Sequence, residues 1–128
     1  MPEANILVVT DDPILSRALR TVLSAKGYGV ATIDSSDDPL HSCCSGKYDL
    51  VLVDDDLYEC STLEICNAIK RVSEIPLVVM NGDISDDNPD PDALHGIVTS
   101  QMRKPFGVSE LFACLCETVE KRPSLSVI

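Results

Sequence analysis

The chain has 128 residues, 45% of them hydrophobic, and a formal net charge of −11. This length fits a single domain with one core over residues 1–128. The negative charge argues against direct binding to nucleic acid or a membrane surface, because both attract basic patches. No apolar run reaches the roughly 20 residues of a membrane span, and residues 1–5 lack a signal-peptide pattern, so we expect a cytoplasmic protein.

The cysteine and histidine spacing favours neither disulfides nor zinc. No two of the six cysteines form a C-x-x-C pair, and Cys43 and Cys44 are adjacent. We therefore expect free, mostly buried thiols in a reducing compartment. His41 and His95 have no partner at ligand spacing and are expected at surface or packing positions.

The first part of the chain joins an apolar run to a helical pattern. Residues 5–10, NILVVT, are short and β-branched, which predicts a buried strand. Asp12 before Pro13 is typical of a helix N-cap and first turn, and Gly27 is typical of the left-handed residue that ends a helix. The residues expected on the buried face of this helix are Ile14, Leu15, Ala18, Leu19, Val22 and Leu23.

The middle of the chain continues the alternation. A second strand is predicted at residues 30–33, followed at most by a weak helix at residues 36–46. A third strand is predicted at residues 50–54. Ser61 and Glu64 have the spacing of a capping box that opens the next helix. The residues expected on its inner face are Ile65, Ala68, Ile69 and Val72.

The last part contains two further strand patterns and a closing helix. Residues 76–80 predict a fourth strand, and a long polar loop follows at residues 81–91. We expect a short helix near residues 91–96 and a weaker strand at residues 97–102. The apolar positions of the closing helix are Val108, Leu111, Phe112, Leu115 and Val119.

Strand and helix therefore alternate five times. This order predicts an α/β domain with a parallel sheet covered by helices on both faces. In open sheets of this kind, ligands bind outside the carboxyl ends of the strands, where the strand order reverses. The residues directly after each strand are therefore the first to inspect for function.

Polar and charged residues gather at these predicted strand ends. Asp11 follows the first strand, Asp54 ends the third, Asn81 follows the fourth and Lys104 follows the fifth. Two converging carboxylates favour a bound cation, and Mg²⁺ prefers such oxygen ligands. Lys104 would add a positive charge for an anion, an arrangement suited to phosphoryl transfer. For Asp12 the interpretation that we favour is a helix cap.

Four stretches in chain order resemble the receiver domain of two-component response regulators. They are ILVVTDDP (6–13), YDLVLVDDDL (48–57), IPLVVMNG (75–82) and RKPF (103–106). The resemblance spans about residues 4–122 and leaves residues 123–128 as a tail. It implies a doubly wound, flavodoxin-like fold with five parallel strands in the order 2-1-3-4-5.

The resemblance also implies a role for each matching residue. Asp54 would be the phosphoacceptor, taking its phosphoryl group from a sensor histidine kinase or a phosphotransfer protein. Mg²⁺ would be held by Asp11, Asp54 and the backbone carbonyl of Asp56. Lys104 would pair with a phosphoryl oxygen, and the Asn81 amide would donate to another. Signalling would proceed through a downstream protein or a fused output domain. We expect no enzyme activity beyond self-catalysed phosphotransfer and autodephosphorylation.

Several positions depart from the pattern of the family. Thr10 occupies the first of two acidic positions, and Asn81 the position of a hydroxyl residue. Gln101 replaces the switch aromatic, and Tyr58 stands where the family has proline. The residues for phosphorylation are thus largely present, whereas the coupled hydroxyl and aromatic residues are absent.

These departures leave a second interpretation, a phosphorylation-independent pseudo-receiver that acts as a protein interaction module. A third is an aspartate-nucleophile phosphatase, because VLVDDDLY resembles a D-x-D motif with Asp54 as nucleophile and Asp56 as acid/base. That family places its motif after the first strand of a longer chain. The receiver interpretation is therefore the one that we favour.

Overall fold

The structure is a computed structural model that describes residues 4–37, 47–55, 57, 61–81, 100–103 and 107–120. Asp56, Lys104 and the short helix predicted near residues 91–96 lie outside the described residues. Of the weak helix predicted at residues 36–46, only Ser36 and Asp37 are described, and they lie in a turn.

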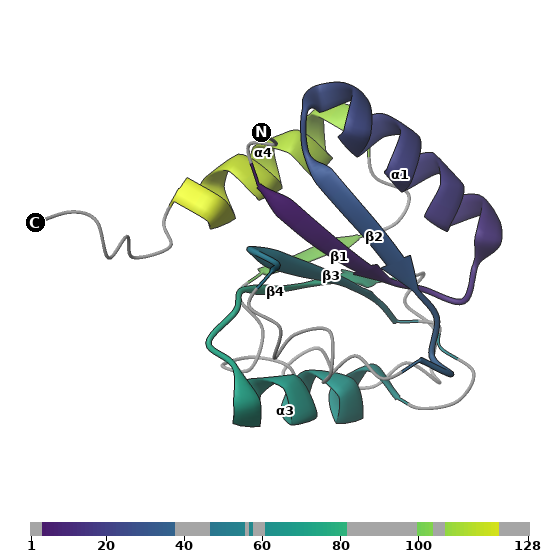
Figure 1. Ribbon diagram of the computed structural model, residues 1–128, viewed down its shortest axis with the longest axis vertical. Helices are drawn as coiled ribbons and strands as arrows, with labels where there is room; N and C mark the ends of the chain where they lie inside the picture. Colours follow the sequence, from purple (N-terminus) through teal and green to yellow (C-terminus); the bar gives the residue numbers. More distant parts are fainter. Residues whose placement is uncertain are drawn as a thin grey trace, which may run out of the picture.

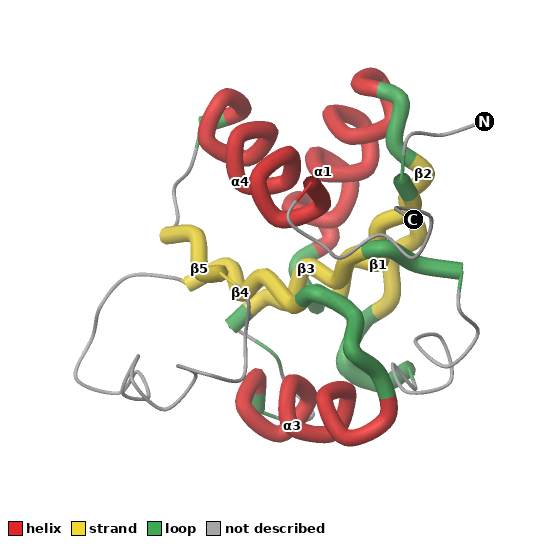
Figure 2. Tube along the Cα trace, turned by 90° about the vertical axis from the view of Figure 1, so that its left-hand side faces the viewer, coloured by secondary structure: helices red, strands yellow, loops and turns green. Residues whose placement is uncertain are grey.

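Five parallel strands form one sheet in the order β2-β1-β3-β4-β5, which confirms the predicted fold (Figures 1 and 2). The first four strands lie within one residue of their predicted bounds; of the strand predicted at residues 97–102, residues 97–99 lie outside the described residues, and the rest forms part of β5. Their bounds are Asn5–Val9 (β1), Gly29–Ile33 (β2), Leu50–Asp54 (β3), Leu77–Asn81 (β4) and Ser100–Arg103 (β5). Because β1 lies between β2 and β3, the strand order reverses beside it, which is where this class of sheet binds ligands.

Three described helices cover the two faces of the sheet. They are α1 (Pro13–Lys26), α3 (Thr62–Val72) and α4 (Val108–Glu120). Figure 2 shows α1 and α4 side by side on one face and α3 on the other. The caps are those expected: Asp12 and Ser61 accept backbone N–H groups of α1 and α3, and Gly27 ends α1 with a φ of 107°. That left-handed φ is unstrained only for glycine.

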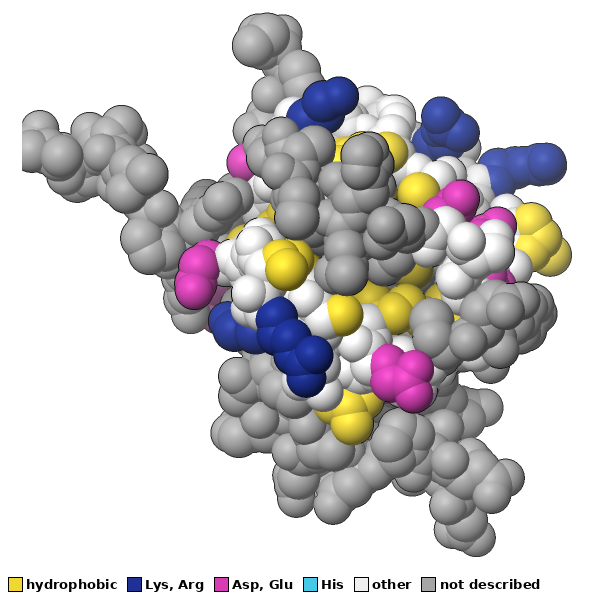
Figure 3. All heavy atoms as spheres, turned by 60° about the horizontal axis from the view of Figure 1, so that its bottom comes forward, with side chains coloured by type: hydrophobic (Ala, Val, Ile, Leu, Met, Phe, Trp, Pro, Cys, Tyr) yellow, Lys and Arg dark blue, Asp and Glu magenta, His cyan; other side chains and the backbone are white. Residues whose placement is uncertain are grey.

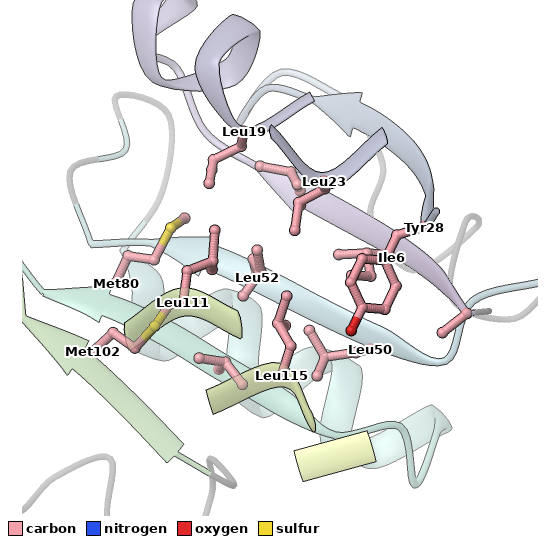
Figure 4. Close-up of a cluster of buried hydrophobic side chains, with 13 residues drawn as sticks. Ile6, Leu19, Leu23, Tyr28, Leu50, Leu52, Met80, Met102, Leu111 and Leu115 are labelled. Atoms are coloured by element: carbon pink, nitrogen blue, oxygen red, sulfur yellow. The ribbon is translucent and has the colours of Figure 1, made fainter. Parts of the chain in front are cut away.

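The strand side chains alternate between two apolar clusters, one on each face of the sheet. Ile6, Val8, Leu50 and Leu52 belong to the cluster beneath α1 and α4. Figure 4 shows Ile6, Leu50 and Leu52 among the helix residues Leu19, Leu23, Leu111 and Leu115. The intervening strand residues pack against α3, and they include Leu7, Val9, Val51 and Val53. The strands are therefore buried on both faces, as their continuous apolar runs predict.

Some residues predicted on the inner helix faces are exposed instead. Ile14 is 79% exposed, Val72 50% and Val108 53%, and Ala18 also faces solvent. In α1 the face toward the sheet is narrower than the run of apolar residues, and it centres on the buried Leu19 and Leu23. Val72 and Val108 stand at helix ends, where less of the sheet lies beneath them.

A cation–π contact joins two helices on one face of the sheet, and the surface on the other face mixes charged and apolar side chains. The Lys26 ammonium lies 5.3 Å from the centroid of the Phe112 ring, so a cation–π contact joins α1 to α4. On the side that carries α3, basic, acidic and apolar side chains are interspersed (Figure 3). Within the described ranges, no helix is both long and apolar enough to span a lipid bilayer.

Candidate functional site at the carboxyl ends of β1 and β3

The register of the sheet brings Thr10 and Asp54 together. Val9 and Val53 are the last paired residues of β1 and β3. Thr10 and Asp54 each come one residue later, so they lie next to each other at the ends of the two strands. Both side chains belong to the face toward α1 and α4, by the alternation of the strands. Thr10 is 4% exposed and Asp54 1%, although aspartate is rarely buried without polar partners.

The Thr10 hydroxyl is a direct partner of the Asp54 carboxylate. It donates to Asp54 Oδ2 at 2.6 Å, and it accepts the backbone N–H of Asp12 at 3.1 Å. Because the Asp12 N–H must donate, the single hydroxyl proton of Thr10 is left for Asp54. The short distance is typical of a hydrogen bond to an ionised carboxylate. Sequence reasoning singled out both residues without predicting this bond.

The backbone of Asp54 is fixed by a second threonine. The Thr62 hydroxyl donates to the Asp54 carbonyl at 2.8 Å, and Thr62 is 5% exposed at the start of α3. The N–H of Asp55 donates to the Met80 carbonyl at 3.1 Å, which extends the contact between β3 and β4. Hydrogen bonds thus join the backbone at Asp54 and Asp55 to the start of α3 and to β4. Sequence reasoning used Ser61 as the cap but missed Thr62, which follows it.

Asp11 is bound to the end of β2. Its Oδ1 accepts the backbone N–H of Ser35 at 2.9 Å, and its Oδ2 accepts the Ser35 hydroxyl at 2.7 Å. Asp11 is half-buried. Sequence reasoning missed Ser35, because it lies in an Asp- and Ser-rich segment without a periodic pattern.

The Asp12 carboxylate caps α1 and does not replace the acid that is absent at position 10. Its Oδ1 accepts the N–H groups of Ile14 at 2.9 Å and Leu15 at 3.3 Å, and the side chain is exposed. This confirms the helix-cap interpretation.

The remaining predicted site residues are described only in part. Asn81 is the last residue of β4, and its backbone pairs with Arg103 on β5. Asp56 and Lys104 lie outside the described residues. Among the residues that the structure describes, no group of three acidic, histidine or cysteine side chains is placed to hold a metal ion.

An open polar hollow of about 310 Å³ adjoins Thr10 and Asp11. Its walls come from the ends of β1 and β2 and the start of α1, and they include Asp34 and Asp37. The Ser36 hydroxyl and N–H donate to Asp34, which lowers the pKa of that carboxyl, while the nearby charge of Asp11 opposes the shift. The hollow is thus acidic and rich in hydroxyl groups.

The donor chemistry of the site fits a hard divalent cation. Asp11 follows β1 and Asp54 ends the neighbouring strand β3, so both offer carboxylate oxygens at this edge of the sheet. Mg²⁺ usually binds one or two carboxylates and keeps several water ligands. Neither carboxylate lacks partners in this structure, since Thr10 and Ser35 donate to them.

The fold and site together define a flavodoxin-like α/β domain with aspartates at its topological switch point. The family described as "Response regulator receiver domain" matches residues 6–115. The chain therefore belongs to the response-regulator receiver domain family, the signalling domains of two-component systems. This confirms the resemblance found in the sequence.

Individual proteins agree with this assignment. The response regulator ArlR of Staphylococcus aureus is 29% identical over 124 residues, which are 97% of this chain and 56% of ArlR. The chain thus spans about half the length of the curated relatives that it matches.

Solved structures share the fold. A two-component response regulator from Clostridium difficile has a TM-score of 0.83 at 23% identity, over 95% of this chain and 100% of that one. The Vibrio cholerae chemotaxis protein CheY4 has a TM-score of 0.78 at 18% identity, over 90% of this chain and 98% of CheY4.

Proposed function

We propose that this receiver domain accepts a phosphoryl group on Asp54 from a sensor histidine kinase or a phosphotransfer protein. A carboxylate oxygen of Asp54 attacks the phosphorus of the phosphohistidine, a P–O bond forms, and the P–N bond breaks with its electron pair going to the imidazole. A small phosphodonor such as acetyl phosphate would react at the same carboxylate.

The observation that carries this proposal is the burial and position of Asp54. A carboxyl group that is 1% exposed at the end of the central strand contributes little to packing and is costly without polar partners. Its neighbours hold it in place, with Thr10 on Oδ2 and Thr62 on the carbonyl. A nucleophile fixed at the switch point of the sheet is suited to in-line attack.

We further propose that phosphorylation depends on Mg²⁺ held by Asp11, Asp54 and the backbone carbonyl of Asp56. When bound, the ion would neutralise the negative charge of the carboxylates and of the incoming phosphoryl group. Thr10 replaces one acid with a neutral hydroxyl, so the site has one charge fewer to attract the ion. Lys104 would pair with a phosphoryl oxygen, and Asn81 would donate to another.

The signal would leave the domain through a partner. We infer that this partner is a downstream protein or a fused output domain. Turnover would be limited to self-catalysed phosphotransfer and autodephosphorylation.

The test is incubation of the folded protein with acetyl phosphate or phosphoramidate and Mg²⁺, followed by intact mass measurement. Wild type is expected to gain one phosphoryl group, and Asp54→Asn none. Asp49→Asn is a matched control beside the same strand. Asp49 lies just before β3, at the opposite end from Asp54, and accepts the Asn5 N–H at 2.8 Å, which an asparagine oxygen also accepts.

Two results would contradict the proposal. One is a folded wild-type protein that gains no phosphoryl group at millimolar donor and Mg²⁺, and the other is a phosphoryl adduct that persists in Asp54→Asn. The first result would direct attention to partners that bind the unmodified domain.

A further inference from the structure

The Asp11 carboxylate is held on the side of β1 away from Asp54. Both of its oxygens accept hydrogen bonds from Ser35, which follows β2. Asp54 ends β3, and in the sheet β2 and β3 lie on opposite sides of β1. The Asp11 carboxylate is therefore directed toward the end of β2 and away from Asp54, whereas the Asp54 carboxylate accepts its hydrogen bond from Thr10 at the end of β1.

The turn that carries Ser35 is organised by its own hydrogen bonds. The Asp34 N–H donates to Asp37 Oδ2 at 3.0 Å, and the Asp37 N–H donates to the Asp34 carbonyl at 3.1 Å. The Ser36 N–H donates to Asp34 Oδ1 at 2.9 Å. These bonds fix the turn, so the Ser35 N–H and hydroxyl are presented to Asp11 as a preorganised pair of donors.

We propose that Ser35 competes with Mg²⁺ for the Asp11 carboxylate, so that metal loading requires release of Asp11 from the turn at residues 34–37. This rests on the proposed function, in which Asp11 and Asp54 share the ion. An ion between Asp11 and Asp54 needs an Asp11 oxygen on the β3 side, whereas the Ser35 bonds draw both oxygens toward β2. Ser35 is thus a positioning residue that sets the Mg²⁺ affinity of the site.

The competition has a defined direction. Without the Ser35 hydroxyl, Asp11 Oδ2 loses one donor while Oδ1 keeps the backbone N–H. The cost of releasing Asp11 falls, and Mg²⁺ binds more tightly. If Ser35 instead orients Asp11 for the metal, as outer hydrogen bonds often do, its removal would weaken binding.

The experiment is calorimetric titration of the full chain with MgCl₂ in the absence of a phosphodonor. Ser35→Ala is expected to lower the Mg²⁺ Kd roughly threefold to tenfold, the range for one net hydrogen bond. Ser36→Ala is the matched control, because its hydroxyl donates to Asp34 and not to Asp11, and its Kd should stay within about twofold of wild type. Asp11→Asn should weaken binding in any background.

An unchanged or raised Kd in Ser35→Ala would overturn the inference while leaving the proposed function in place. No Mg²⁺ binding by wild type would overturn both the inference and the metal requirement. A second readout does not depend on any variant folding: in wild type, Mg²⁺ should shift the backbone amide resonance of Ser35, since its bond to Asp11 Oδ1 breaks. A Ser35 amide that stays unshifted at saturating Mg²⁺ would also refute the competition.

Discussion

The bond between Thr10 and Asp54 makes a direct prediction about stability. Thr10→Val keeps the β-branched shape of the side chain but removes the hydroxyl that donates to Asp54 Oδ2 at 2.6 Å. Asp54 is 1% exposed, so water does not readily replace the lost donor. The Asp12 N–H also loses its acceptor, but Asp12 is exposed and water can take that place.

The magnitude follows from the kind of bond that is lost. A hydrogen bond to a charged group contributes roughly 1.5–3 kcal/mol, and we expect Thr10→Val to lower the free energy of unfolding by about 2 kcal/mol. With a urea m-value of roughly 2 kcal/mol/M for a domain of this size, the unfolding midpoint falls by about 1 M. Thr10→Ser retains the hydroxyl and should lose less than about half as much.

Urea unfolding followed by circular dichroism measures these differences, and a double-mutant cycle with Asp54→Asn identifies their source. The asparagine side-chain oxygen in that variant still accepts a hydrogen bond but is uncharged, so Thr10→Val should cost only about half as much there. Thr10→Val as stable as Thr10→Ser would refute the reasoning. An equal cost in both backgrounds would show that the Asp54 charge plays no part.

Three further predictions test the helix cap, the core and the buried thiol. Asp12→Ala should lower the free energy of unfolding by about 1 kcal/mol because α1 loses its cap, whereas Asp12→Asn should cost much less; thermal unfolding of both variants checks this. Leu115→Ala should cost about 2–5 kcal/mol in urea unfolding, because the side chain is fully buried between α4 and the sheet, and a cost under about 1 kcal/mol would contradict that packing. Burial raises the pKa of the Cys66 thiol to about 12 from 9.0, so the unfolded chain loses this proton at lower pH than the folded chain does. The free energy of unfolding should therefore fall as the pH rises from about 9 to about 12, and it should fall less in Cys66→Ala.

The strands were predictable from sequence because each is a short apolar run buried on both faces. For β3 the predicted and observed bounds coincide, β1 ends one residue earlier than predicted, and β4 begins and ends one residue later. The cap at Asp12 and the glycine at Gly27 were predictable because each has a local cause in the backbone of α1. The helix faces were predicted too broadly, as the exposure of Ile14 shows, because periodicity does not reveal how much sheet lies beneath a helix.

The site was predictable in its residues but not in its contacts. Asp11 and Asp54 were predicted as site residues because they stand at the carboxyl ends of predicted strands. The hydrogen-bond partner of each carboxylate, however, depends on the register and order of the strands. The pairing of Val9 with Val53 is what brings Thr10 to Asp54. Ser35 reaches Asp11 only because β2 lies beside β1, a relation between residues 24 positions apart.

Two hydroxyl groups shape the electrostatics of this receiver domain. Neighbouring carboxylates repel each other, and a cation or a hydrogen-bond donor lowers the free energy of the ionised pair. Here Thr10 donates to Asp54 and Ser35 donates to Asp11, so each carboxylate is stabilised before any metal arrives. A metal that displaces such donors gains less free energy than one that binds unsatisfied acids. Thr10 in the position of an acid and the Ser35 contact therefore act in the same direction: both stabilise the metal-free domain, and under the proposed function both would weaken Mg²⁺ binding.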